Sequence, residues 1–86
     1  RASQMHGYTY VYILQSVNSP SRHYTGMTDD LKARLAKHNS GGCPHTSKFM
    51  PWRIRTAVAF HDRAQAAAFE AYLKTHSGRV FASRHF

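Results

Sequence analysis

The sequence predicts a single small α/β domain in which helices flank a three-stranded sheet, in the order β-β-α-β-α. Three observations carry this prediction. Residues 8–15 combine aromatic and β-branched side chains with a period of two, two later segments begin with helix-capping residues, and a length of 86 residues allows one modest core. The connections between the expected elements are short, which favours one sheet covered by its own helices.

The sheet is expected from three segments. Residues 8–15 read Tyr-Thr-Tyr-Val-Tyr-Ile-Leu-Gln, which is typical of a strand that is buried on both faces. A turn that contains Ser and Pro separates it from a short second strand over residues 23–25, which ends at Gly26. These two strands are expected to pair as an antiparallel hairpin, and a third strand is predicted over residues 53–60.

Capping residues mark two helices. Thr, Asp and Asp at residues 28–30 precede a helix that is expected to run to about His38, where an Asn-Ser-Gly-Gly segment ends it. Residues 40–51 form a long loop, and ordered loops of this length are usually functional. A second helix is expected over residues 63–76, capped by the preceding His-Asp pair and broken by the Ser-Gly pair that follows.

The chain carries a strong positive charge. Twelve Lys and Arg residues against four Asp and Glu residues give a formal net charge of +8, and the pI is near 10.3. The expected partner is a polyanion, most often nucleic acid. One cysteine excludes an internal disulfide, and no apolar run suits a membrane span or a signal peptide, so we expect a cytoplasmic protein with no membrane partner. Residues 1–7 are interpreted as an N-terminal extension or a remnant of expression, which leaves residues 8–86 as the domain.

The four acidic residues can be accounted for one by one. Asp29 and Asp30 are expected in the first turn of the first helix and Asp62 at the start of the second, where acids suit the free N–H groups and the helix dipole. Glu70 has no such role in the middle of the second helix. It either pairs with Lys74 one turn later, which stabilises a helix by only about 0.2–0.5 kcal/mol, or it binds a divalent metal ion.

An ordered set of motifs resembles the GIY-YIG nuclease superfamily, in particular its small stand-alone members. The matching segments are residues 10–14 (Tyr-Val-Tyr-Ile-Leu), 24–26 (Tyr-Thr-Gly) and 28–39, followed by Glu70 on the last long helix. The resemblance spans residues 8–78 and implies a GIY-YIG-like fold. It also implies an endonuclease, a phosphodiester hydrolase that uses Mg²⁺ or Mn²⁺ to cut nucleic acid.

The resemblance assigns roles to individual residues. Glu70 matches the position that holds the metal ion, and Arg34 matches the position that contacts the scissile phosphate. Tyr12 and Tyr24 match the positions that line the side from which water attacks. Met27 stands where excision-repair relatives have a lysine, and an asparagine of some members has no clear counterpart. These departures leave open which group polarises the attacking water.

A proton relay is expected at this site. Tyrosine, with a reference pKa of about 10, is a poor base at neutral pH, whereas histidine has a reference pKa of about 6.5. His38 lies one helical turn after Arg34 on the same side, so we expect it to withdraw a proton from Tyr12 or Tyr24, whose oxygen then deprotonates water. The sequence does not choose between the tyrosines. Plain structural alternatives are packing for Tyr12, the helix dipole for His38 and a surface guanidinium for Arg34.

The long loop and the C-terminal stretch interleave cations with aromatic rings. This composition suits single-stranded DNA, whose phosphates would meet Lys and Arg while its bases stack on the rings. The residues predicted to bind nucleic acid are Lys48, Trp52, Arg53, Arg79, Phe81, Arg84 and Phe86. Trp52 can equally pack the loop onto the core.

Three other functions remain open at this point. The fold can serve as a catalytically inactive nucleic-acid-binding module, the nuclease can be structure-specific or cut double strands, or a basic domain can contact a protein or membrane surface. Both tyrosines, Arg34 and Glu70 argue against the inactive module, and the lack of an amphipathic basic helix argues against a membrane surface. Zinc is not expected, because Cys43 has no second cysteine and no two histidines have ligand spacing.

Overall fold

A computed structural model describes residues 7–86, which contain three strands and four helices. In chain order these are β1 (Thr9–Ser16), β2 (His23–Thr28), α1 (Leu31–Asn39), α2 (Pro44–Ser47), β3 (Trp52–Phe60), α3 (Arg63–Leu73) and α4 (His76–His85). The predicted α/β class is confirmed. The extension predicted over residues 1–7 lies, apart from Gly7, outside the described residues. Among the described residues, no helix is long and apolar enough to cross a membrane.

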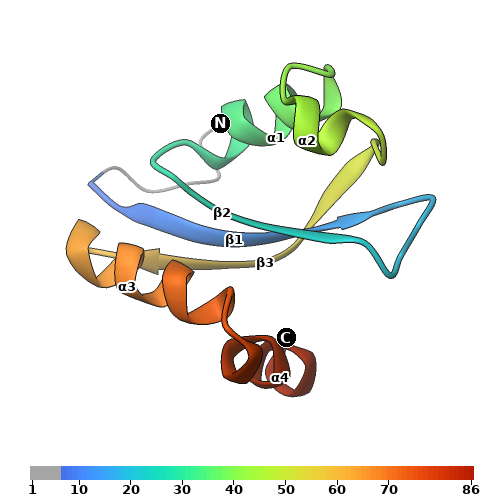
Figure 1. Ribbon diagram of the computed structural model, residues 1–86. Coiled ribbons are helices and arrows are strands. Elements are labelled where there is room, and N and C mark those ends of the chain that lie inside the picture. The colour runs from blue at the N-terminus through green and yellow to red at the C-terminus, as the bar shows by residue number, and fades with distance from the viewer. Residues whose placement is uncertain (1–6) are drawn as a thin grey trace.

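The sheet is antiparallel with the strand order β2-β1-β3, so β1 is hydrogen-bonded on both sides. The predicted hairpin of β1 and β2 is confirmed. Figure 1 shows α1 and α2 on one face of the sheet and α3 and α4 on the other. Because strands flank it on both sides and helices cover both faces, β1 is buried along nearly its whole length, as its aromatic and β-branched sequence predicts.

The side chains of β1 alternate between two cores. Tyr12 and Leu14 pack on the face covered by α1, together with residues of α1 and β3. Val11 and Ile13 pack on the opposite face, against the fully buried Ala66 of α3. One strand therefore supplies neighbouring residues to two separate sets of contacts, as the period of two requires.

The end of the chain differs from the prediction. The helix expected over residues 63–76 stops at Leu73, and α4 begins after Thr75, whose hydroxyl accepts the N–H of Gly78 at 3.1 Å. Gly78 therefore does not break a helix but lies in the first turn of α4. A Cβ atom there would collide with the carbonyl oxygen of Tyr72, so this glycine allows α4 to pack closely against the end of α3.

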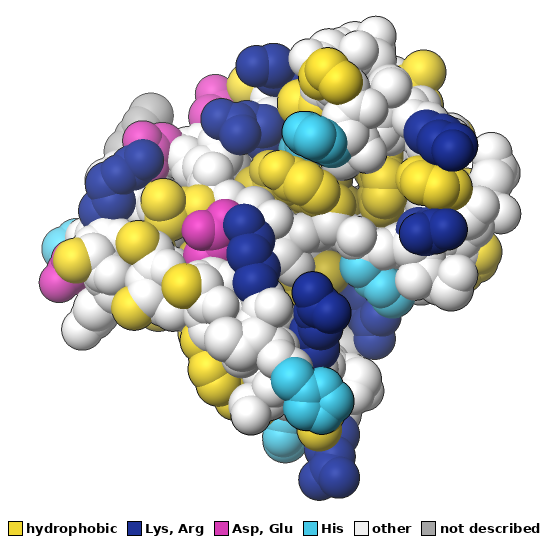
Figure 2. All heavy atoms as spheres, viewed as in Figure 1, with side chains coloured by type: hydrophobic (Ala, Val, Ile, Leu, Met, Phe, Trp, Pro, Cys, Tyr) yellow, Lys and Arg dark blue, Asp and Glu magenta, His cyan; other side chains and the backbone are white. Residues whose placement is uncertain are grey.

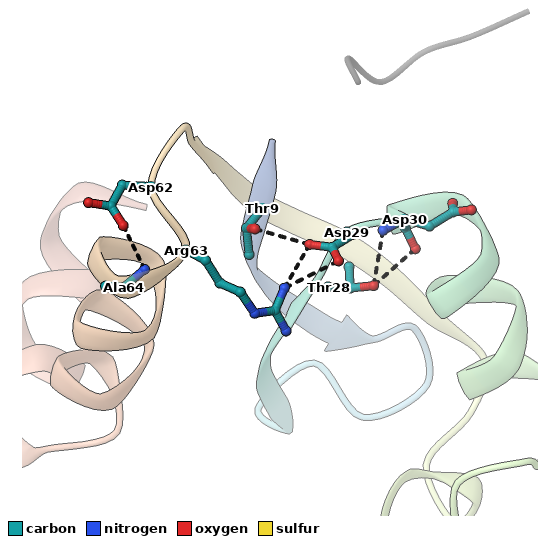
Figure 3. A network of polar contacts seen from close by, with 7 residues as sticks. All are labelled: Thr9, Thr28, Asp29, Asp30, Asp62, Arg63 and Ala64. Atoms are coloured by element: carbon teal, nitrogen blue, oxygen red, sulfur yellow. Dashed lines mark hydrogen bonds and ion pairs between the residues drawn. The ribbon is translucent and has the colours of Figure 1, made fainter. Parts of the chain in front are cut away.

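The acidic residues at the helix starts have two different roles. Asp30 caps α1 and Asp62 caps α3 by accepting backbone N–H groups at 3.1 Å and 2.8 Å, as predicted. Asp29 is not in the helix. It accepts the Thr9 hydroxyl at 3.0 Å and the Arg63 guanidinium at 2.9 Å, and Figure 3 shows that these contacts join β1, the β2–α1 connection and the start of α3.

Candidate active site

Tyr12 lies in the middle of β1, is 2% exposed and packs on the α1 side of the sheet. The strand register puts it opposite Gly26 on β2. A Cβ atom on Gly26 would lie 2.5 Å from the Tyr12 hydroxyl oxygen and 2.7 Å from Cζ, so the phenol occupies the space that any other side chain would need. Glycine at this position is therefore required by the close approach of the Tyr12 ring.

His38 extends from the last turn of α1 to Tyr12 and is 1% exposed. Its Nε2 lies 3.1 Å from the Tyr12 hydroxyl oxygen, and its Nδ1 lies 2.8 Å from Thr46 Oγ1. The Thr46 hydroxyl donates to the carbonyl oxygen of Cys43 at 3.3 Å, so it accepts a hydrogen bond from Nδ1–H. This assignment leaves Nε2 of the neutral imidazole as the acceptor of the Tyr12 hydroxyl.

Thr46 is a site residue that sequence reasoning did not single out. It lies in the short helix α2, within the segment expected to be a loop, and it is 1% exposed. Its backbone oxygen also accepts the indole N–H of Trp52 at 2.8 Å, which fixes the position of α2 under the site. A threonine in a polar segment with Gly and Pro gives no sequence signal of burial, because such residues are usually exposed.

Tyr24 completes a group of three rings. It is half-buried on β2, an outer strand of the sheet, and its ring centroid lies 4.9 Å from that of His38 and 6.4 Å from that of Tyr12. The two tyrosines differ in their contact with His38, because Tyr12 makes the hydrogen bond and Tyr24 makes a ring contact. The sequence did not indicate which tyrosine His38 contacts through a hydrogen bond. In the structure it is Tyr12.

Burial and charge oppose each other at this group. Burial, and next the neighbouring Tyr24, raise the pKa of Tyr12 to about 12, whereas the charge and hydrogen bond of Arg34 lower it. Burial lowers the pKa of His38 below its usual value, and the charges of Arg34 and Lys37 lower it further. At neutral pH the site therefore holds a neutral phenol beside a neutral imidazole, with the half-buried Arg34 as the nearby permanent cation.

Glu70 lies on α3, across the sheet from α1 (Figure 1). Its carboxylate pairs with Lys74 at 3.1 Å, with exposed side-chain fractions of 22% for Glu70 and 54% for Lys74. Over residues 7–86, no three His, Cys, Asp or Glu side chains gather closely enough to hold a metal ion. A metal ion at Glu70 would therefore complete its ligands with water and substrate oxygens, which suits Mg²⁺ and Mn²⁺. The partly exposed carboxylate fits such an ion.

Trp52 requires a correction, because the structure gives it a core position. It is 4% exposed and hydrogen-bonded through its indole N–H, so its ring is not available to stack on a base. Phe81 and Phe86 pack against the core on the α3 side, and their ring centroids lie 5.5 Å apart. Phe86 thus has a packing role that its place in the sequence did not indicate. Both rings are half-buried, which leaves only part of each for a ligand.

The predicted cations Lys48, Arg53, Arg79 and Arg84 are all exposed. Figure 2 shows Lys and Arg side chains distributed over the face that joins the two helical layers, with acidic side chains mainly toward one side. This distribution gives the face that contains the edge of β2 a positive potential, which attracts polyanions.

Comparisons with known proteins agree with this arrangement. Residues 8–83 match the family described as GIY-YIG catalytic domain. A UPF0213 protein from Lacticaseibacillus paracasei is 36% identical over 80 residues, which cover 88% of this chain and 88% of that protein. A UPF0213 protein from Streptococcus agalactiae is 36% identical over 66 residues, covering 76% of this chain and 73% of that protein.

A third relative is much longer. A structure-specific endonuclease subunit SLX1 homolog from Giardia intestinalis is 35% identical over 74 residues, which cover 81% of this chain but 20% of that protein. The family match extends over both tyrosines, Arg34, His38 and Glu70. The chain therefore belongs to the GIY-YIG family and is a nuclease.

Proposed function

We propose that this nuclease is a metal-dependent endonuclease that hydrolyses DNA phosphodiester bonds and prefers single strands. The observation that carries the proposal is the hydrogen-bond chain from the Tyr12 hydroxyl through His38 to Thr46. Packing alone does not call for this chain, because apolar residues at the same positions would avoid burying three polar groups. The direction of its hydrogen bonds suits a histidine that accepts a proton from Tyr12.

Tyr12 is the group that activates water in this proposal. With its pKa raised to about 12, it is protonated at neutral pH and becomes a base only when it loses its own proton. Nε2 of His38 lies 3.1 Å from the hydroxyl oxygen, and its lone pair accepts the hydrogen bond from that hydroxyl. His38 takes the Tyr12 proton while the Tyr12 oxygen takes one from water, and Thr46 holds the imidazole in the required tautomer.

Arg34 stabilises negative charge on the phosphate. A guanidinium can donate two parallel hydrogen bonds to phosphoryl oxygens, which suits the charge that builds up as the hydroxide attacks. Arg34 also lowers the pKa of both Tyr12 and His38. A bound phosphate offsets the charge of Arg34, so substrate binding makes His38 a better proton acceptor than it is in the free protein. Tyr24 borders the attacking water from β2.

Glu70 is the residue that would hold the divalent ion, with Mg²⁺ or Mn²⁺ as the candidates. Such an ion would supply electrostatic stabilisation of the phosphoryl and leaving oxygens. An ion at Glu70 would compete with Lys74 for the carboxylate. Loss of the ion pair costs little, because a pair at i and i+4 contributes only about 0.2–0.5 kcal/mol to helix stability.

Single-stranded DNA is the proposed substrate. The net charge of +8 and the exposed cations favour a polyanion. The half-buried rings of Phe81 and Phe86 support stacking only through the parts that the core leaves open. The buried Trp52 is not one of the proposed DNA contacts.

A structure-specific nuclease is the second candidate function. It is favoured by the relative from Giardia intestinalis, which is described as a structure-specific endonuclease subunit. Such an enzyme would cut where single and double strands meet, and it would use the same catalytic residues. The two candidates therefore differ only in the substrate that is cut fastest.

The experiment compares cleavage of end-labelled single-stranded, duplex and branched DNA with Mg²⁺, with Mn²⁺ and with a chelator. Tyr12→Phe removes the hydroxyl and keeps the ring. Tyr8→Phe is the matched control, because Tyr8 is half-buried and its ring lies 5.1 Å from that of His61, away from the site. We expect metal-dependent cutting, fastest on single strands, which Tyr12→Phe reduces by about a hundredfold or more and Tyr8→Phe preserves.

Two results would contradict the proposal. The first is the absence of metal-dependent cutting on every substrate, and the second is a Tyr12→Phe variant that cuts as well as the parent. Fastest cutting of the branched substrate would select the structure-specific function.

A further inference from the structure

A cavity of about 560 Å³ lies between β2 and α4, beside the proposed catalytic residues. Four Lys and Arg side chains and one histidine line it, and no acidic side chain does. Figure 2 shows basic and histidine side chains gathered between the sheet and α4. The basic residues are Arg22, His23, Arg55, Lys74 and Arg79. Lys74 has a counter-charge in Glu70, but no carboxylate lines the cavity itself, so its basic side chains suit an anion.

Some of these basic side chains are held in place by internal contacts. Arg55 donates from Nη1 to Nε2 of His23 at 2.9 Å and from Nε to the carbonyl oxygen of Phe86 at 3.1 Å. Burial, and next the charge of Arg55, lower the pKa of His23. The imidazole is therefore neutral, and its Nε2 accepts the hydrogen bond from Arg55. Arg22 rests on the ring of Phe49 at 4.6 Å. These contacts orient the side chains before a ligand arrives, which lowers the entropy cost of binding.

Part of the cavity lining is apolar. It is formed by side chains of the core on the α3 side, namely Ile13, Leu73 and Phe86. A free phosphate would use only the basic side chains, whereas a nucleotide has a phosphate for these and a sugar and base for the apolar ones. The volume also lies within the range of about 300–1,000 Å³ that is typical of small-molecule sites.

Two residues connect the cavity to the catalytic group. Tyr24 lines the cavity and lies with its ring 4.9 Å from that of His38. Lys74 lines the cavity and pairs with Glu70 at 3.1 Å. A strand whose scissile phosphate lies at the catalytic residues therefore has a neighbouring nucleotide close to the cavity.

We propose that the cavity is a nucleotide subsite, which takes one unstacked nucleotide of the substrate strand next to the scissile bond. Arg79 and Arg22 hold its phosphate, and Phe86 packs against its sugar or base. This inference rests on the proposed function and extends it. A nucleotide inside a duplex is stacked and paired, so the subsite favours single-stranded or locally unpaired DNA over an intact duplex.

The test measures binding of thymidine 3′,5′-bisphosphate to the full chain in a chelator, with inorganic phosphate as the comparison ligand. Nuclear magnetic resonance signals of the His23 ring report whether the ligand enters the cavity. We expect the bisphosphate to shift these signals and to bind at least about tenfold more tightly than phosphate. Arg79→Ala should weaken its binding by about tenfold, because one charge-assisted hydrogen bond is lost.

Arg63→Ala is the matched control, since it removes the same charge at an exposed position that does not line the cavity. An equal loss in both variants, an unchanged His23 signal, or equal affinity for phosphate and bisphosphate would overturn the subsite. DNA cleavage by the parent is measured separately. A protein that cuts DNA without binding the bisphosphate lacks the subsite but keeps its function, and one that binds it without cutting DNA keeps the subsite alone.

Discussion

The two sides of β1 are equally buried but differ in kind. Tyr12 is 2% exposed and joins a directed chain of hydrogen bonds on the α1 side, whereas Val11 is 1% exposed and joins an apolar cluster on the α3 side. Burial alone therefore does not mark a functional residue on this strand. What distinguishes the α1 side is that its buried polar groups are paired in an order that can move a proton. Substitutions there should change activity more than stability, and substitutions on the α3 side should do the reverse.

The largest effect on cleavage is expected at Glu70. This residue is an exception to the rule that the α3 side serves stability, because it is proposed to act in catalysis from that side. Glu70→Gln keeps the size of the side chain and removes its charge, so it should lower cleavage by about a thousandfold if several kcal/mol of metal-dependent stabilisation are lost. DNA binding and the unfolding midpoint should change little. Asp29→Asn, the same change at a different acid, should keep cleavage. Cleavage by Glu70→Gln at the parent rate would show that Glu70 serves only as the ion-pair partner of Lys74.

The next largest effect is expected for His38, measured as the pH dependence of single-turnover cleavage. A neutral His38 is needed to accept the Tyr12 proton, so the rate should fall as the pH drops through the pKa of His38. Because that pKa is lowered, the fall should be centred below about 6.5. His38→Gln should cut about a hundredfold more slowly and lose this limb.

Thr46→Val tests how much catalysis depends on fixing the tautomer of His38, as distinct from the presence of the imidazole itself. It removes the acceptor of Nδ1–H and keeps the shape of the side chain, so cleavage should fall by less than in His38→Gln. An unchanged pH profile in both variants would assign His38 to packing alone.

Gly26→Ala tests whether the position of the Tyr12 ring matters for catalysis. The new methyl group would lie 2.5 Å from the Tyr12 hydroxyl oxygen, so the phenol must move away from His38. We expect a loss of about 1–3 kcal/mol in the free energy of unfolding, as for other overpacked sites, and a loss of cleavage in the protein that remains folded. Gly42→Ala is the control. The atom nearest to the new methyl group would be Cγ of the flexible Lys37 side chain, at 3.2 Å. Full cleavage by folded Gly26→Ala would show that the ring has freedom to shift.

Val11→Ala tests the α3 side of the strand. Removal of two buried methyl groups should lower the free energy of unfolding by about 2 kcal/mol, measured by urea denaturation. Cleavage per folded molecule should be unchanged, because the hydrogen-bond chain lies on the other side of β1. A selective loss of cleavage at unchanged stability would show that the two sides are not independent.

The smallest effect is expected at the ion pair that ties the start of α3 to the β2–α1 connection. Arg63 and Asp29 are 63% and 67% exposed, so Arg63→Ala should cost at most about 1 kcal/mol in urea denaturation, and less at high salt. A larger loss would mean that this contact fixes the position of α3.

Local features of the fold could be predicted, and features set by distant contacts could not. Asp30 and Asp62 cap their helices because a cap needs only the next few residues. Asp29 has the same local sequence signal, but its partners Thr9 and Arg63 are distant in the chain. Gly78 looks like a helix break until the carbonyl oxygen of Tyr72 is known to lie against it.

The site divides in the same way. Spacing and resemblance indicate both tyrosines, Arg34 and His38, but the choice of Tyr12 as the residue hydrogen-bonded to His38 depends on strand register and ring geometry. Thr46 gives no such signal, because its contact with His38 depends on how α2 packs against α1. The cavity between β2 and α4 was hidden from sequence reasoning, because α4 itself was not predicted.

The central position of β1 also has a consequence for motion. Backbone amides with hydrogen-bonded strands on both sides exchange with solvent only when much of the domain opens, whereas amides of an outer strand exchange through local fraying. Tyr12 therefore lies in the segment that should open last, and Tyr24 lies in one that opens more readily. The phenol paired with His38 is held in the most protected part of the molecule, while the phenol beside the cavity lies where the backbone can adjust to an arriving strand.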